Sequence, residues 1–460
     1  MGENSTTQPT WKGYHKIGFR YALIFFVLFI IFMDWSVNPI LTQLYYYGPL
    51  PTLLDNVVSW VGKDLFNIQY LIISPYDGEH NDRTYVYLLY FTIALVAALG
   101  TILWSLLDRK RQNYQVLYYW LTTIIRYYLA FTLFLFALYK FFKVQFPNLG
   151  YYTLTEQVGD MSSMHLAWAF FGHSYEYNVF MGLAEGAALL LFFRRTTALG
   201  AILIMVALLN VMAVNYSYDV HAKMYPTALF VMALFLFLKD AKSIIRFFLT
   251  GQAISLSVIQ APVYKKRWVR ISKTVLKIGV IGYFLIVSVK ENMSYKKSSE
   301  ESLQAKSEYA GLYDIELFTL NKDTLSLENS QRWQQLVIGD RILEAVRFRR
   351  DSVAFINVDV DKKELILYGD PKDLSEKTQE VYNELGIADS IYYGMDSILI
   401  ARKKISRLYF EKLDSTTLVL KGMIKNDSVF ITAKRKPLDI NEFRLMKRRF
   451  HWINESSYFY

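Results

Sequence analysis

The chain has 460 residues, of which 53% are hydrophobic, and carries a formal net charge of +10 without a single cysteine. The absence of cysteine excludes disulfides, thiol nucleophiles, thiolate-bound iron–sulfur clusters and c-type haem attachment on this chain. Residues 291–460 hold 27 of the 51 basic and 27 of the 41 acidic residues, so the basic excess lies entirely in residues 1–290. A basic excess diluted in an apolar region indicates membrane insertion and argues against nucleic-acid binding.

Seven apolar segments are candidate membrane spans, since a span requires about 20 mostly apolar residues. They are residues 17–33, 85–107, 114–138, 177–193, 197–214, 225–238 and 274–289. The last two are short, and we expect Lys277 in the last segment to extend its ammonium group to an interface. The first segment is followed by no small-residue cleavage site, so no cleavable signal peptide is expected.

Basic residues between these segments predict their orientation. Four basic groups lie before the first, after the second, after the fourth and after the sixth segment, and they include Lys12, Lys16, Arg20, Arg109, Lys110, Arg111, Arg194, Arg195, Lys265, Lys266, Arg267 and Arg270. With a cytoplasmic N-terminus, seven spans place all four groups on the cytoplasmic side, as the positive-inside rule requires. We therefore expect a bacterial inner-membrane protein whose residues 291–460 lie in the periplasm.

The charged C-terminal region shows the alternating pattern of β-strands. Residues 291–310 are polar and predict a linker. Strands are predicted at residues 352–360, 364–368, 397–401, 408–412, 417–421 and 428–432, with a short helix at 374–385. Closely spaced strands favour a small antiparallel sheet or barrel, and about 150 residues can bury a core without disulfides.

The predicted fold class is thus an α-helical polytopic membrane bundle of about seven spans followed by a mainly-β soluble domain. Five parts are expected: an N-terminal membrane segment (1–111), a four-helix membrane module (112–250), a cytoplasmic basic loop with the last span (251–290), a linker (291–310) and an extracytoplasmic mainly-β domain (311–460).

Two charged residues lie in the middle of predicted spans. Charges inside a membrane are costly, so each is a candidate functional residue. Arg126 lies far from both ends of its span, and Glu185 lies nine residues before Arg194, which suggests a similar depth for the two side chains. They could form a structural ion pair between two helices, or a polar site that binds a ligand headgroup or relays protons.

A second group of polar candidates lies at the outer end of the fifth span, at Asn210, Asn215, Asp219 and Lys223. These side chains could cap and anchor two helices at the interface, or rim a pocket that opens outward. No metal site is predicted, because His173 and Glu176 share the spacing of one helical face but lack a third close ligand. No motif identifies a catalytic residue.

Several short motifs resemble the DoxX-like family, a four-helix membrane module. Residues 126–130, 139–142, 182–185 and 193–201 follow one another in the order of that family, over about residues 120–246. The family places a glycine shortly before the lysine of its first helix, whereas Leu138 and Tyr139 precede Lys140 here. A narrower likeness, at residues 215–223, 234–240 and 448–455, is to uncharacterised DoxX-like proteins of the Bacteroidetes with a soluble tail.

The resemblance implies a redox-associated role, since the family is named after a subunit of a thiosulfate:quinone oxidoreductase. It implies a membrane module that binds a quinone or supports a redox partner, with Arg126 and Glu185 at the polar positions of the family. Tyr127 and Tyr128 could supply the aromatic slot that a quinone requires.

Two other functions stay open on the sequence alone. One is a non-enzymatic envelope scaffold, in which the helices anchor the chain in the lipid bilayer and the β domain binds a membrane or periplasmic protein. The other is a small-solute transporter, although the sequence shows no internal repeat and few interruptions within the spans. Whether the chain is an enzyme, and whether quinone is its cofactor, are questions that the sequence leaves open.

Overall fold

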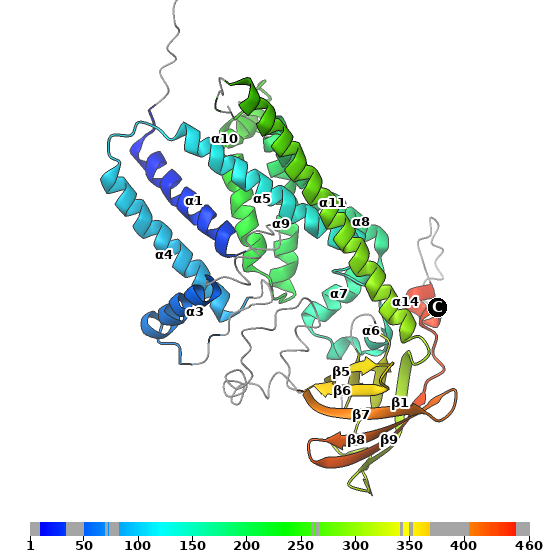
Figure 1. Ribbon diagram of the computed structural model, residues 1–460. Helices are drawn as coiled ribbons and strands as arrows, with labels where there is room; N and C mark the ends of the chain where they lie inside the picture. The colour runs from blue at the N-terminus through cyan, green and yellow to red at the C-terminus, as the bar shows by residue number, and fades with distance from the viewer. Residues whose placement is uncertain are drawn as a thin grey trace, which may run out of the picture. The chain divides into compact units, whose positions relative to one another are not determined.

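The structure is a computed structural model that describes residues 10–33, 50–69, 72, 82–256, 258–259, 262, 266–340, 344–348, 353–368 and 404–447 (Figure 1). The chain forms two compact units. The helical unit comprises residues 1–142 and 176–292, and the β unit comprises residues 143–175 and 293–460. The β unit is therefore built from two segments far apart in sequence, one of which lies between two helices of the helical unit.

The helical unit is made mainly of long apolar helices. They are α1 (Gly13–Phe32), α3 (Leu50–Trp60), η1 (Val61–Leu65), α4 (Thr84–Leu107), α5 (Gln115–Phe141), α8 (Tyr175–Gly186), η3 (Ala187–Phe192), η4 (Arg194–Thr196), α9 (Thr197–Ser217), α10 (Met224–Thr250) and α11 (Arg267–Ala305). Among the described residues, five helical stretches are long and apolar enough to cross a membrane: Gly13–Phe32, Thr84–Leu107, Gln115–Phe141, Arg194–Ser217 and Arg267–Ala305. The other two predicted segments are also helical, in α8 with η3 and in α10.

Helix packing in this unit buries one side of each helix and leaves apolar side chains outside. Phe29, Leu129 and Leu229 are among the fully buried residues of α1, α5 and α10. Gly200 permits a close approach of α9 to η3, because a Cβ at this position would lie 3.0 Å from a Leu191 methyl group. In α11 most apolar side chains are exposed, which suits a helix surrounded by lipid.

Helix α11 continues through residues 291–305, where the sequence predicts a linker. This stretch contains neither glycine nor proline, and three Glu, two Lys, one Met, one Leu, one Gln and one Ala among its 15 residues are good helix formers. Asn292 also donates to the Ser288 carbonyl oxygen at 2.9 Å, one turn earlier. Nothing in the local sequence therefore ends the helix, although the segment is polar.

The β unit contains an antiparallel sheet of β1 (Gly311–Leu320), β2 (Asp323–Thr324), β3 (Gln335–Ile338), β4 (Ala345–Arg347), β5 (Val353–Asp359), β6 (Glu364–Tyr368), β7 (Lys404–Lys412), β8 (Thr417–Ile424) and β9 (Asp427–Arg435). The strands follow the order β2-β1-β3-β4-β5-β6-β7-β8-β9, and β1 also pairs with β9. This last pairing closes the sheet into a barrel-like ring and confirms the mainly-β prediction. The predicted helix at 374–385, the predicted strand at 397–401 and the terminal motif at 448–455 lie outside the described residues.

Alternate side chains of the strands fill the interior of this ring. Leu418 and Leu420 of β8 meet Val429 and Ile431 of β9, and Trp333 also lies in this core. The ring pairs Leu420 with Ile431 directly, so the register places both apolar side chains on the inner face.

The segment from residue 143 to 175 covers part of the outer face of the same sheet. It forms α6 (Tyr151–Thr155), η2 (Val158–Asp160) and α7 (Ser163–His173). Tyr152 packs with Leu312, Val337 and Ala345, which point outward from β1, β3 and β4. After β9 the chain forms η6 (Ile440–Glu442) and α14 (Arg444–Lys447).

Candidate functional site

The buried ion pair of the helical unit joins Lys140 of α5 to Glu185 of α8. Lys140 Nζ lies 2.8 Å from Glu185 Oε2, and the two side chains are only 6% and 5% exposed. Gly182 makes the close approach of these helices possible, because a Cβ at this position would collide with the ring of Phe141. Glu185 is therefore buried and paired, but with Lys140 rather than with Arg126.

Arg126 binds the end of a helix instead of a carboxylate. It is 2% exposed, and its Nε donates to the Leu191 carbonyl oxygen at 2.8 Å. The helix of α8 tightens into the 3₁₀ form at η3, and the Phe193 N–H donates to the Leu190 carbonyl oxygen at its end, at 3.2 Å. Lys277 of α11 donates to the Phe192 carbonyl oxygen at 2.7 Å, and Thr196 donates to that of Leu190 at 2.6 Å.

Three consecutive carbonyl oxygens at this helix end thus receive side-chain donors from three different elements. The C-terminal end of a helix carries partial negative charge, so cationic donors are favourable there. Inside a membrane no water would otherwise satisfy the carbonyl groups of Leu191 and Phe192. Lys277, for which the sequence suggests an extension to an interface, is bound within the helical unit.

The polar group at the end of α9 forms a helix cap. Asp82 accepts hydrogen bonds from the backbone N–H groups of Lys223 at 2.8 Å and Met224 at 3.2 Å, at the start of α10. Lys223 Nζ lies 2.8 Å from Asp219 Oδ1 and 3.6 Å from Asp82 Oδ2. Asn215 donates to the Ala222 carbonyl oxygen at 2.8 Å.

The structure therefore brings together three of the four predicted residues and adds Asp82. These contacts match the capping alternative, since each of them fixes the turn between α9 and α10. Asn210 lies on α9 with an exposed side chain, and within the described part of the chain it takes no part in this network.

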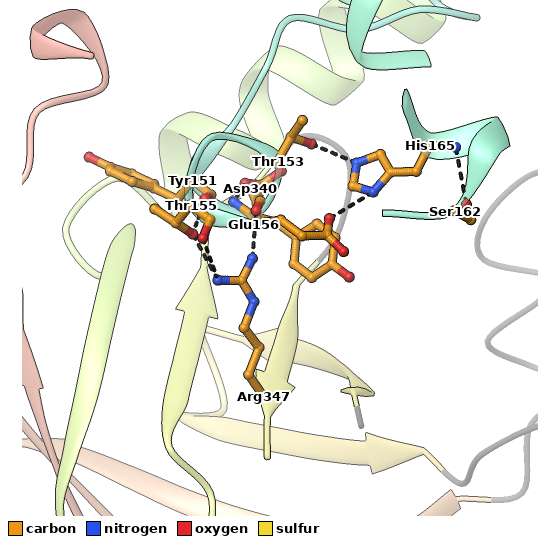
Figure 2. A network of polar contacts seen from close by, with 9 residues as sticks. Tyr151, Thr153, Thr155, Glu156, Ser162, His165, Asp340 and Arg347 are labelled. Atoms are coloured by element: carbon orange, nitrogen blue, oxygen red, sulfur yellow. Dashed lines mark hydrogen bonds and ion pairs between the residues drawn. The ribbon is translucent and has the colours of Figure 1, made fainter. Parts of the chain in front are cut away.

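A second polar network lies within the β unit and fastens α6 to the sheet (Figure 2). Asp340, just after β3, accepts a hydrogen bond from the backbone N–H of Tyr152 at 2.8 Å. Arg347 of β4 donates to the Tyr152 carbonyl oxygen at 2.6 Å and to Thr155 Oγ1 at 2.9 Å. Gly150 leaves room for this contact, because a Cβ there would collide with the Asp340 carboxylate.

His165 of α7 completes this network from the other side of α6. Its Nε2 lies 3.0 Å from Thr153 Oγ1, its Nδ1 lies 2.8 Å from Glu156 Oε2, and its ring stacks on Tyr152 with centroids 5.6 Å apart. Burial, aided by the Glu156 carboxylate, raises the pKa of Tyr152 to about 12, so its phenol stays neutral.

Hydroxyl, imidazole and carboxylate stand here in the order of a nucleophile, its base and the group that orients the base. Thr153 is only 4% exposed, however, so its hydroxyl is screened from a substrate. The geometry therefore supports a structural role, in which His165 and Glu156 hold α7 against α6. His173 ends α7 and Glu176 lies in the first turn of α8, so these two residues do not share one helix.

Sequence reasoning did not identify Lys140 as the partner of Glu185. It also did not identify Asp82, Asp340 and Arg347 as members of the polar networks. The signal for Lys140 was present, since the DoxX-like pattern contains a lysine near this point. For Asp82, the signal was a short acidic side chain in a loop, a type that favours helix caps. No sequence signal marked Arg347 or Asp340, because their partners in α6, mostly backbone groups, lie nearly 200 residues away in the chain.

Comparison with known proteins yields one informative match. No protein-family model matches this chain, and no solved structure matches it. Over 124 residues the chain is 36% identical to the uncharacterized protein YwoB of Bacillus subtilis (strain 168). The aligned stretch covers 79% of that protein and 27% of this chain. Because most of YwoB is matched at this identity, the chain belongs to the same family as YwoB.

Proposed function

We propose that this chain is a non-enzymatic envelope scaffold, in which a membrane-embedded helical unit holds the β unit outside the cytoplasm for binding to a protein partner. The observation that carries this proposal is the composite β unit, in which residues 143–175 join residues 293–460. Three covalent connections, after Phe142, Tyr175 and Asn292, therefore link the two units. A soluble domain on three connections has less freedom than a domain on one linker, which suits a scaffold.

The composite β unit also supports the predicted topology. Its two segments must lie on the same side of the membrane, so an even number of spans must separate them. The seven-span arrangement gives four spans between residues 175 and 293, and the five apolar helices give two. Both counts are even, and the distribution of basic loops then favours the extracytoplasmic side for the β unit. We propose the inner membrane and periplasm for a cell with two membranes.

The packing favours a scaffold over an enzyme or a quinone-binding subunit. The inner face of the ring is filled with apolar side chains, and the hydroxyl of Thr153 is screened. Arg126 and Glu185, the polar groups that the DoxX-like resemblance would offer to a quinone, are bound to Leu191 and Lys140. A quinone would have to displace these partners, so redox association is our second hypothesis.

The absence of native cysteine gives a clean test of the topology. Gly159→Cys lies in the first segment of the β unit, Asn426→Cys in the turn between β8 and β9, and Gln252→Cys after α10, all at exposed positions. In intact cells or spheroplasts, a membrane-impermeant maleimide should label the first two variants equally and Gln252→Cys only after permeabilisation. Labelling of Gly159→Cys and Asn426→Cys from opposite sides would contradict the composite β unit and the proposal together.

A separate experiment distinguishes the scaffold from the redox hypothesis. The full chain, purified in a mild detergent, is extracted with solvent and analysed for quinone. The scaffold hypothesis expects less than one quinone per ten protein molecules. A stoichiometric quinone that is lost in Glu185→Gln but kept in Asp219→Asn would instead support the redox hypothesis.

A further inference from the structure

Four cationic side chains gather around the end of η3 in the helical unit. Arg126 of α5 and Lys277 of α11 donate to the carbonyl oxygens of Leu191 and Phe192, at 2.8 and 2.7 Å. Lys273, one turn before Lys277, donates to the hydroxyl of Tyr119 at 2.8 Å. Arg194 of η4 donates to the Ile259 carbonyl oxygen at 3.0 Å. We call Arg126, Arg194, Lys273 and Lys277 the cation cluster.

Arg126, Arg194 and Lys277 donate these hydrogen bonds to uncharged backbone carbonyl oxygens. Within the described residues, no carboxylate forms an ion pair with Arg126, Arg194 or Lys277. Arg126, Arg194 and Lys273 all lie close enough to Lys277 to repel its charge. Gathering several like charges in a poorly hydrated site is costly unless an anion offsets them. The cluster is therefore suited to a bound anion with more than one acceptor oxygen.

The surroundings of the cluster are apolar and aromatic. Lys277 Nζ lies 5.5 Å from the ring centroid of Phe193 and 5.9 Å from that of Tyr127. Trp120 and Ile124 of α5, which carries Arg126, are exposed on the surface of the helical unit. An anion that belongs here must be compatible with hydrocarbon beside it, which favours a headgroup that carries acyl chains.

We propose that the cation cluster binds the phosphate group of an anionic phospholipid from the cytoplasmic leaflet. Arginine and lysine are the usual partners of phosphate oxygens, and basic pockets between membrane helices are suited to anionic headgroups. The leaflet follows from Arg194 and Arg195, which lie in a loop that the distribution of basic residues places on the cytoplasmic side. The bound phosphate would also fasten α11 to α5 and η4, since these elements supply the cations.

Native mass spectrometry of the full chain in mild detergent tests this proposal, with phosphatidylglycerol and phosphatidylcholine as probes. Wild type should retain phosphatidylglycerol in preference to phosphatidylcholine. Lys273→Gln with Lys277→Gln should weaken phosphatidylglycerol binding at least about tenfold, because each basic residue contributes to attraction of an anionic headgroup. The matched control, Lys242→Gln with Arg246→Gln, removes two exposed charges from α10 and should bind as wild type does.

The variant Arg194→Gln is a second test that should not disturb folding, because the Arg194 side chain is exposed and lies in a short connection. It should weaken phosphatidylglycerol binding several-fold while the protein elutes as wild type in size-exclusion chromatography. Equal binding of the two lipids by wild type, or equal retention of phosphatidylglycerol by the cluster variant and the α10 control, would overturn the proposal. Displacement of the lipid by millimolar inorganic phosphate would also overturn it, since it would assign the site to a soluble anion.

Discussion

The two units of this protein use buried charge in different ways. In the helical unit, Lys140 and Glu185 pair across two helices, and Arg126 binds the carbonyl end of a third element. In the β unit, Asp340 binds the backbone of Tyr152, 188 positions earlier in the chain. The first set of contacts keeps helices together where water is absent, whereas the second decides which loop docks on the sheet.

This difference predicts how far the effect of a substitution should spread. A charged side chain that loses its partner between membrane helices has no water to hydrate it. Removal of the partner should therefore weaken the whole helical unit. In the β unit, Arg347 is only partly buried, so the groups around it can be hydrated when it is removed, and its loss should loosen one segment. The experiments below test this distinction, starting with the largest expected effect.

Removing one partner of the membrane ion pair should cause the largest loss of stability. Glu185→Ala removes the carboxylate that pairs with Lys140, and breaking a buried ion pair in this way typically costs about 3–5 kcal/mol of unfolding free energy. The measurement is unfolding of the full chain in detergent with increasing dodecyl sulfate, followed by helical circular dichroism. Glu185→Gln should lie between the alanine variant and wild type, because the amide can still accept a hydrogen bond.

The double variant Lys140→Met with Glu185→Leu is the control for this experiment. It replaces both charges by apolar side chains of similar volume, which is often neutral or stabilising for a buried pair. It should therefore recover most of the stability that Glu185→Ala loses. If the double variant is as unstable as Glu185→Ala, the pair does not explain the effect and packing around Gly182 does.

A smaller and local effect is expected for Arg347→Ala in the β unit. The substitution removes charged donors from the Tyr152 carbonyl oxygen and Thr155 Oγ1, and such bonds contribute about 2 kcal/mol each. Hydrogen exchange at residues 150–156 should accelerate, while exchange in the middle of α5 stays as in wild type. Arg407→Ala, which removes a half-exposed arginine paired with Glu364, is the matched control. Equal acceleration in both regions would remove the contrast between the units.

The sequence predicts the elements of the helical unit better than their partners. All seven predicted apolar segments lie in helices, and Arg126 and Glu185 are buried, as charges in the middle of spans suggest. Whether Arg126 and Glu185 pair depends on the depth of each side chain in the membrane. The sequence gives this depth only through residue counts, at about 1.5 Å per residue of α-helix. Arg126 instead lies beside Leu191, and Glu185 lies beside Lys140, further along α5. The extra rise of the 3₁₀ helix η3, about 0.5 Å per residue, is too small to explain this offset, so counting residues from Arg194 is not sufficient to predict which groups meet.

The β unit illustrates a different limit of sequence reasoning. Alternation of apolar residues predicts strands such as the one within β9, because every second side chain faces the core. The docking of residues 143–175 has no such periodicity. It depends on Asp340 and Arg347 meeting backbone groups of α6, and any residue could carry those groups. The DoxX-like resemblance and the quinone hypothesis stay predictions.

The helix cap at Asp82 should contribute less than either of these networks. Asp82→Ala removes the acceptor for the N–H groups of Lys223 and Met224, and loss of an N-terminal cap typically costs about 1 kcal/mol. Exchange of the first-turn amides of α10 should accelerate, and Asp82→Asn should restore most of the protection. Asp219→Ala serves as the control and should leave these amides unchanged, because an exposed ion pair contributes little. Equal exchange in the Asp82 and Asp219 variants would contradict the cap.

The smallest effect is expected at the turn between β7 and β8, where charge is fully exposed. Asp414 accepts hydrogen bonds from Thr416 N, Thr416 Oγ1 and Thr417 N at 2.7–2.9 Å, and these hold its pKa at about 2. The folded-state pKa lies below the ordinary value of about 4, so the stabilisation is present above pH 4 and is lost between pH 4 and 2. Asp414→Asn keeps an acceptor oxygen but cannot titrate. Its unfolding midpoint should therefore fall less than that of wild type from pH 4 to pH 2, whereas Asp414→Ala should lose the turn at every pH. Parallel curves for wild type and Asp414→Asn would show that this exposed carboxylate adds nothing to the stability of the β unit.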